Sequence, residues 1–104
     1  MPIDHKRWPF TPAMLEYAPE DPGVYVLWDG EEIVYIGRAH GAQNVRTCLL
    51  AHHAGSLGEC TKKATHYSWA ISMWPAAMET EIFSEFHKRF MRDPRCHDQK
   101  KEVA

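Results

Sequence analysis

Residues 23–37 of the chain read GVYVLWDGEEIVYIG. Two runs of β-branched, aromatic and aliphatic residues flank Asp29-Gly30-Glu31-Glu32, and an Asp-Gly pair between such runs is a strong signal for a tight turn. We therefore expect two antiparallel strands joined as a hairpin. Because side chains alternate between the faces of a strand, the usual pairing can bring Tyr25 and Tyr35 to one face. The alternation divides the second strand into two faces: Ile33 with Tyr35, and Val34 with Ile36.

Length, composition and charge limit the classes of protein to consider. The 104 residues suffice for one domain with a single modest core, and 44% hydrophobic with 25% charged residues is typical of a soluble globular protein. A net charge of −2 argues against a protein that coats nucleic acid through bulk positive charge. A basic surface can still be local, since residues 38–66 hold one acid, Glu59, against four basic residues: Arg38, Arg46, Lys62 and Lys63. A solvated loop and helix face explains the same counts equally well.

The ends of the chain and its cysteines suggest a compartment. No apolar run approaches the length of about 18 to 20 residues that a membrane span needs, and residues 1–7 are too polar for a signal peptide. Three widely spaced cysteines, Cys48, Cys60 and Cys96, make a disulfide framework an unfavoured interpretation. We expect a cytoplasmic single domain over residues 1–104, with an N-terminal arm at 1–10 and a flexible tail at 98–104.

The remaining elements follow from caps and periodicity. Thr11 and Asn44 are typical helix N-caps and predict helices over 12–18 and 45–54. Residues 65–73 alternate as a half-buried strand whose core face comprises Tyr67, Trp69, Ile71 and Met73. An apolar stripe predicts a last helix over 76–91, whereas residues 8–10 and 55–63 have no regular pattern. The predicted fold is α+β, a three-stranded antiparallel sheet flanked by helices in the order α-β-β-α-β-α.

Two triplets in the hairpin carry a family resemblance. Gly23-Val24-Tyr25, nine further residues and then Tyr35-Ile36-Gly37 resemble the paired signature of the GIY-YIG nuclease family. An Arg- and His-bearing helix and then a Glu-bearing helix follow in that family's order, so the likeness covers about residues 21–97. It implies a GIY-YIG-like fold and an endonuclease that hydrolyses phosphodiester bonds of nucleic acid, here DNA, with a divalent metal ion.

The resemblance also implies site residues. The family's tyrosines fall on Tyr25 and Tyr35, and its metal-binding glutamate falls on Glu79, which precedes two apolar residues by three and four positions. Glu81 is a competitor that fits this apolar pattern badly. One carboxylate with waters and a substrate phosphate is an ordinary way to hold Mg²⁺, so we expect one Mg²⁺ or Mn²⁺ ion, weakly held without substrate. The structural alternative is that the tyrosines are sheet aromatics and the glutamate a first-turn acid favoured by the helix dipole.

The helix after the hairpin departs from the family pattern. In the frame Val45 to His52, His52 matches the family's histidine, but Cys48 occupies the position of its catalytic arginine. Arg46 lies about 200° away around a helix. A shorter alignment, which a long loop at 40–43 permits, gives Arg46 the arginine role, and Arg38 is a third source of a guanidinium. We keep these alternatives open, with Tyr25, Tyr35, Arg46, His52 and Glu79 as the catalytic set.

A second departure lies near the C-terminus. The family commonly closes its site with an asparagine shortly after a proline, and here His97 follows Pro94. We expect nucleic-acid contacts from five basic side chains: Arg38, His40, Lys62, Lys63 and His97. Loss of an arginine that stabilises a transition state costs on the order of 100- to 1000-fold in rate. The alternative function is therefore a non-catalytic nucleic-acid-binding or protein-interaction module on the same fold, with a homodimer or a protein partner to assist targeting.

Two rival chemistries are weaker. Cys60 with His66, or Cys96 with His97, are fragments of a zinc site, but no pair has a recognised ligand spacing. Cys48 four residues before His52 has the spacing of a nucleophile and its base, although a cysteine on an apolar helix face is usually packing.

Overall fold

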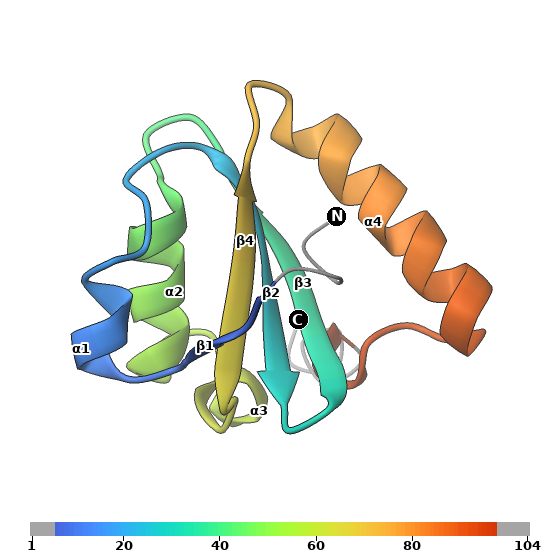
Figure 1. The fold of residues 1–104 in the computed structure, drawn as a ribbon, viewed down its shortest axis with the longest axis horizontal. Helices are drawn as coiled ribbons and strands as arrows, with labels where there is room; N and C mark the ends of the chain where they lie inside the picture. Colours follow the sequence, from blue (N-terminus) through green and yellow to red (C-terminus); the bar gives the residue numbers. More distant parts are fainter. Residues whose placement is uncertain (1–5, 98–104) are drawn as a thin grey trace.

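The computed structural model describes residues 6–97, which form one four-stranded antiparallel sheet with helices on both faces. The sheet order is β1-β4-β2-β3, and Figure 1 shows α1 and α2 on one side of it and α4 on the other. The elements are β1 (Trp8–Pro9), α1 (Pro12–Leu15), β2 (Gly23–Asp29), β3 (Glu32–Ala39), α2 (Val45–His53), α3 (Glu59–Lys62), β4 (His66–Ile71) and α4 (Pro75–Phe90). The α+β class is confirmed. The expected tail at 98–104, and part of the expected arm, lie outside the described residues.

The β2–β3 hairpin forms as predicted but contains a bulge. Leu27 pairs with Tyr35 and Trp28 pairs with Ile33, so the second strand has one extra residue, Val34, at this point. The extra residue moves Ile33 to the face of Ile36 and leaves Val34 beside Tyr35, which corrects the simple alternation expected for this strand.

The prediction of three strands is wrong because residues 8 and 9 add a fourth. Trp8 pairs with Tyr67, and Pro9 pairs with His66, at the outer edge of β4. An edge position tolerates proline because one side of an edge strand needs no ladder hydrogen bond. The next residue, Phe10, is buried in the core.

The strand expected over 65–73 ends earlier than predicted. β4 stops at Ile71, which pairs with Gly23, the first residue of β2, and beyond this pair Ser72 donates one backbone hydrogen bond to Pro22 outside the strands. Ile71 and Met73 are 43% and 77% exposed, against the expectation that both face the core. The chain then turns into α4 through residues 72–74.

Helices α1 and α2 begin directly after their predicted N-cap residues, Thr11 and Asn44. At the start of α2, Asn44 Oδ1 accepts from the backbone N–H of Thr47, and Thr47 Oγ1 accepts from that of Asn44, a complete capping box. The first helix is shorter than expected and ends at Leu15, and α3 occupies part of the expected loop at 55–63. Two apolar clusters fill the space on either side of the sheet, one under α1 and α2 and the other under α4.

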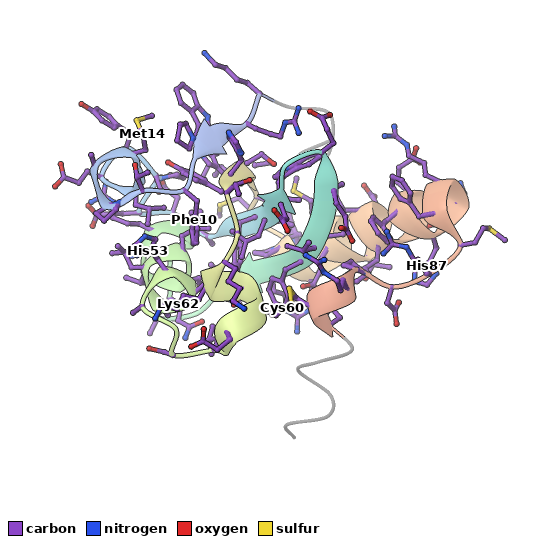
Figure 2. The ribbon with its side chains drawn as sticks, turned by 90° about the horizontal axis from the view of Figure 1, so that it is seen from below. Phe10, Met14, His53, Cys60, Lys62 and His87 are labelled. Atoms are coloured by element: carbon purple, nitrogen blue, oxygen red, sulfur yellow. A yellow bond between two sulfur atoms is a disulfide. The ribbon has the colours of Figure 1, made fainter. Side chains whose placement is uncertain are left out.

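A disulfide joins Cys60 of α3 to Cys96 near the end of the described chain, and Cys60 lies between these two segments in Figure 2. This pairing corrects the expectation of free thiols. The two cysteines are 36 residues apart, and only the fold brings them together. The cysteine count therefore no longer argues for a reducing compartment, and both zinc fragments lose their cysteine. Within residues 6–97, no helix is long and apolar enough to cross a membrane.

Candidate active site

An open cavity of about 840 Å³ lies beside the edge strand β3 and collects most of the predicted site residues. Tyr25 comes from β2, Tyr35 and Arg38 come from β3, Glu79 comes from α4, and His97 follows the disulfide. His40, from the loop after β3, also lines it. Three segments distant in sequence thus meet at one hollow.

Gly37 explains how the two tyrosines share this space. It pairs with Tyr25 across the hairpin, and a Cβ atom at this position would lie 2.5 Å from Tyr25 Cζ and 2.8 Å from Tyr35 Cε2. Only glycine leaves room for both rings, whose centroids lie 6.2 Å apart. The second glycine of the motif is therefore a requirement of close packing rather than of turn geometry.

Two buried hydrogen bonds, through His52 to Thr61, fix the hydroxyl of Tyr25 on the side away from solvent. This hydroxyl lies 3.0 Å from His52 Nε2, and His52 Nδ1 lies 2.8 Å from Thr61 Oγ1. His52 is fully buried and does not line the cavity. The predicted catalytic histidine contacts the cavity-lining rings of Tyr25 and Tyr35, with centroids 5.6 and 4.7 Å away, and does not reach the cavity itself.

The environment of Tyr25 keeps its phenol neutral. Burial, and after it the neighbouring Tyr35, Cys48 and Glu79, raise the pKa of Tyr25 well above the ordinary value for a phenol. A phenolate base at neutral pH is thus disfavoured more strongly than in water. Tyr25 is suited instead to hydrogen bonding with a ligand or a water in the cavity.

Arg38 and Glu79 form an ion pair at the cavity, with Nη1 and Oε1 3.5 Å apart. Glu81, the competitor for the metal-binding role, is exposed and does not line the cavity. Among residues 6–97 there is no group of three His, Cys, Asp or Glu side chains that could hold a metal ion. Glu79 alone still fits Mg²⁺, because this ion keeps several waters and often takes one carboxylate together with a substrate phosphate.

Arg46 does not reach the site. Its guanidinium forms an ion pair with Glu20 at 2.6 Å and donates to the backbone oxygens of Glu16 and Ala18 at 2.7 and 3.0 Å. These contacts fasten α2 to the segment after α1. The alignment that gave Arg46 the arginine role therefore has no support in the geometry, and Cys48 lines the cavity instead.

Cys48 is a poor nucleophile in this setting. Burial raises the pKa of its thiol, which the hydrogen bond with Tyr25 lowers only in part. The thiol donates to Gln43 Oε1 at 3.6 Å. Gln43 and Thr47 also line the cavity and were not singled out by the sequence; the position of Gln43 in the long loop at 40–43 was the only available signal.

His97 closes the cavity at the edge of the sheet. Its Nε2 accepts a hydrogen bond from the backbone N–H of Ile36 at 3.1 Å, and its ring stacks on Tyr35 at 4.3 Å.

The two predicted lysines lie elsewhere. Lys63 lines a separate hollow with Asp29 and Arg95, and Lys62, labelled on α3 in Figure 2, lines neither hollow. The five basic residues therefore do not form one surface.

No protein-family model matches this sequence, and no curated protein does so either. The function must therefore be argued from the residues and geometry of the cavity.

Proposed function

We propose that the cavity binds a phosphodiester of DNA and that the chain is a weakened, metal-dependent endonuclease of the GIY-YIG type. One observation carries the proposal: Tyr25, Tyr35, Arg38 and Glu79 converge from β2, β3 and α4 on one open cavity. The two signature triplets lie side by side there because Tyr25 pairs with Gly37.

In this proposal Arg38 binds the phosphate, Tyr25 orients a water and Glu79 holds the metal ion. A guanidinium such as that of Arg38 binds phosphate through two parallel hydrogen bonds. A Tyr25 hydroxyl that donates to His52 Nε2 keeps its lone pairs for a water in the cavity. Glu79 would hold the divalent ion, which supplies a Lewis acid for the phosphate when bound. Arg38 and Glu79 are paired with each other in the structure. A phosphate must therefore displace Glu79 from Arg38, and a metal ion must displace Arg38 from Glu79.

One feature favours a second function, binding without turnover. Cys48 stands where the resemblance implies an arginine, and Arg46 is engaged outside the cavity. A donor of this kind is worth on the order of 100- to 1000-fold in rate. The same cavity then serves a nucleic-acid-binding module with little or no cleavage.

Cleavage assays separate the two functions. Branched, nicked and single-stranded DNA are incubated with Mg²⁺ or Mn²⁺ and the wild-type chain, Glu79→Gln or Tyr35→Phe. Glu81→Gln is the matched control, because Glu81 is an exposed glutamate of the same helix outside the cavity. An endonuclease requires cleavage that the first two substitutions abolish and the control preserves. Binding without cleavage, weakened by Arg38→Gln, supports the module. Cleavage that survives Glu79→Gln contradicts the assignment of this site.

A further inference from the structure

A second hollow of about 430 Å³ adjoins the main cavity at the start of α4. Arg38 and His40 line both hollows, and Met73, Trp74 and Pro75 form much of the second wall. The chain passes from the end of β4 into α4 here, at the top of Figure 1. A ligand held by Arg38 in the main cavity therefore lies next to this apolar wall.

The apolar side chains of this wall are turned to solvent. Trp74 is 75% exposed and Met73 is 77% exposed. Contiguous exposed apolar surface on a small domain marks an interaction site more often than an isolated exposed residue does. Packing within the chain does not cover Trp74 and Met73. A bound ligand would account for their exposure.

The backbone presents Trp74 on a fixed support. Its N–H donates to Ser72 Oγ at 3.0 Å, and its carbonyl accepts from the N–H of Met78 at 3.2 Å in the first turn of α4. Pro75 follows, and its ring fixes the backbone angle at the start of the helix. An aromatic side chain on such a stem loses little conformational entropy when it binds.

We infer that Trp74 is a stacking platform for an unpaired base whose neighbouring phosphate is bound at Arg38; this rests on the proposed function. Among residues 6–97, no acidic side chain lines the second hollow, and its one charged lining residue is Arg38, which pairs with Glu79 on the side of the main cavity. A phosphate that displaces Glu79 from Arg38 therefore meets a positive charge at this hollow. Aromatic side chains beside a cationic groove bind single strands, because every base has a face that can stack. Bases of an intact duplex are already stacked. The substrate class is therefore DNA with unpaired nucleotides, such as a single strand, flap or fork.

Fluorescence anisotropy with a labelled oligothymidine and a duplex of equal length, in EDTA to prevent cleavage, tests this inference. Trp74→Ala should weaken single-strand binding by roughly 5- to 150-fold. Trp74→Phe should restore most of the affinity. Tyr17→Ala is the matched control, because Tyr17 is an aromatic residue of 77% exposure that lines neither hollow. The control should bind like the wild type, and duplex affinity should change less than single-strand affinity.

Three results overturn the inference and are distinguishable. If Arg38→Gln weakens binding but Trp74→Ala does not, the stacking site is wrong while the phosphate cavity stands. If the wild type binds neither DNA, the stacking site and the proposed function both fall. If DNA affinity is unchanged in Trp74→Ala but sedimentation shows a wild-type dimer that this variant loses, the patch belongs to a second copy of the chain.

Discussion

Arg38 and Glu79 hold their guanidinium and carboxylate 3.5 Å apart between β3 and α4, at the cavity that also contains the two signature tyrosines. Their side chains are 40% and 23% exposed. Ion pairs with this much solvent contact contribute only about 0 to 1 kcal/mol to stability. The pair is therefore weak enough for a phosphate to take Arg38 and for a metal ion to take Glu79.

Removal of the Arg38 charge should weaken DNA binding without unfolding the chain. Arg38→Gln loses one phosphate contact, so we expect the slope of log affinity against log salt to fall in magnitude by about 0.7 to 1. DNA affinity measured at several salt concentrations checks this. Arg89→Gln is the control, because Arg89 is 42% exposed, pairs with Glu85 and lies outside both hollows. Equal slopes for both variants would contradict a phosphate site at Arg38.

The buried hydrogen bonds from Thr61 to His52 and from His52 to Tyr25 should stabilise the fold, although Thr61 lies outside the cavity. Thr61→Val removes the hydroxyl that lies 2.8 Å from His52 Nδ1, and loss of a buried hydrogen bond costs about 1 to 3 kcal/mol. Urea unfolding measures the loss. Thr80→Val, on the exposed face of α4, should change the free energy of unfolding by less than about 0.5 kcal/mol. If both substitutions lowered the free energy of unfolding equally, the hydrogen bonds that link Thr61, His52 and Tyr25 would not contribute to stability.

Stability should fall in alkaline solution because burial raises the pKa of Tyr25. Above pH of about 10 the unfolded phenol loses its proton while the folded one keeps it. The unfolded state then binds fewer protons, so the free energy of unfolding falls by up to about 1.4 kcal/mol per pH unit for this group. Urea unfolding between pH 7 and pH 11 should show a flatter decline for Tyr25→Phe than for the wild type. Parallel declines would mean that this phenol titrates normally in the folded chain.

The Cys60–Cys96 disulfide should support both the fold and the position of His97. It links residues 36 positions apart, and chain-entropy arguments give such a link roughly 3 to 4 kcal/mol. The double variant Cys60→Ser with Cys96→Ser should be destabilised by up to that amount. Its His97 ring signals in NMR spectra should also lose the shift caused by stacking on Tyr35. Cys48→Ser keeps the disulfide and serves as the control; a reductant that leaves the wild-type unfolding midpoint unchanged would contradict the prediction.

The local features of the fold could be predicted because nearby residues determine them. The turn at Asp29-Gly30 and the helix cap at Asn44 each depend on residues that lie close together in the chain. The bulge at Val34 depends on which residues of β2 and β3 come to pair, and the alternation of one strand does not reveal it. The added strand at Trp8 likewise depends on the free edge of β4.

The sequence could indicate which residues line the cavity only where they follow the strands and helices closely. Alternation along the hairpin allowed Tyr25 and Tyr35 to share a face, the family resemblance singled out Glu79, and all three residues line one cavity. The lysines grouped with Arg38 by sequence position do not line its cavity, and Lys63 lies instead with Asp29 in a separate hollow. The sequence does not reveal this, because it depends on long-range packing. The disulfide depended on the same long-range contacts.

Single-turnover cleavage by Cys48→Arg tests the central claim most directly, because it places a guanidinium at a wall of the cavity where the family resemblance implies one. If the cavity is a degenerate endonuclease site, the folded variant should cleave DNA with Mg²⁺ on the order of 100- to 1000-fold faster than the wild type. A second substitution, Glu79→Gln, should remove this gain, whereas Glu81→Gln should not. A folded Cys48→Arg chain with no gain in rate, or a gain that persists without the Glu79 carboxylate, would contradict the assignment.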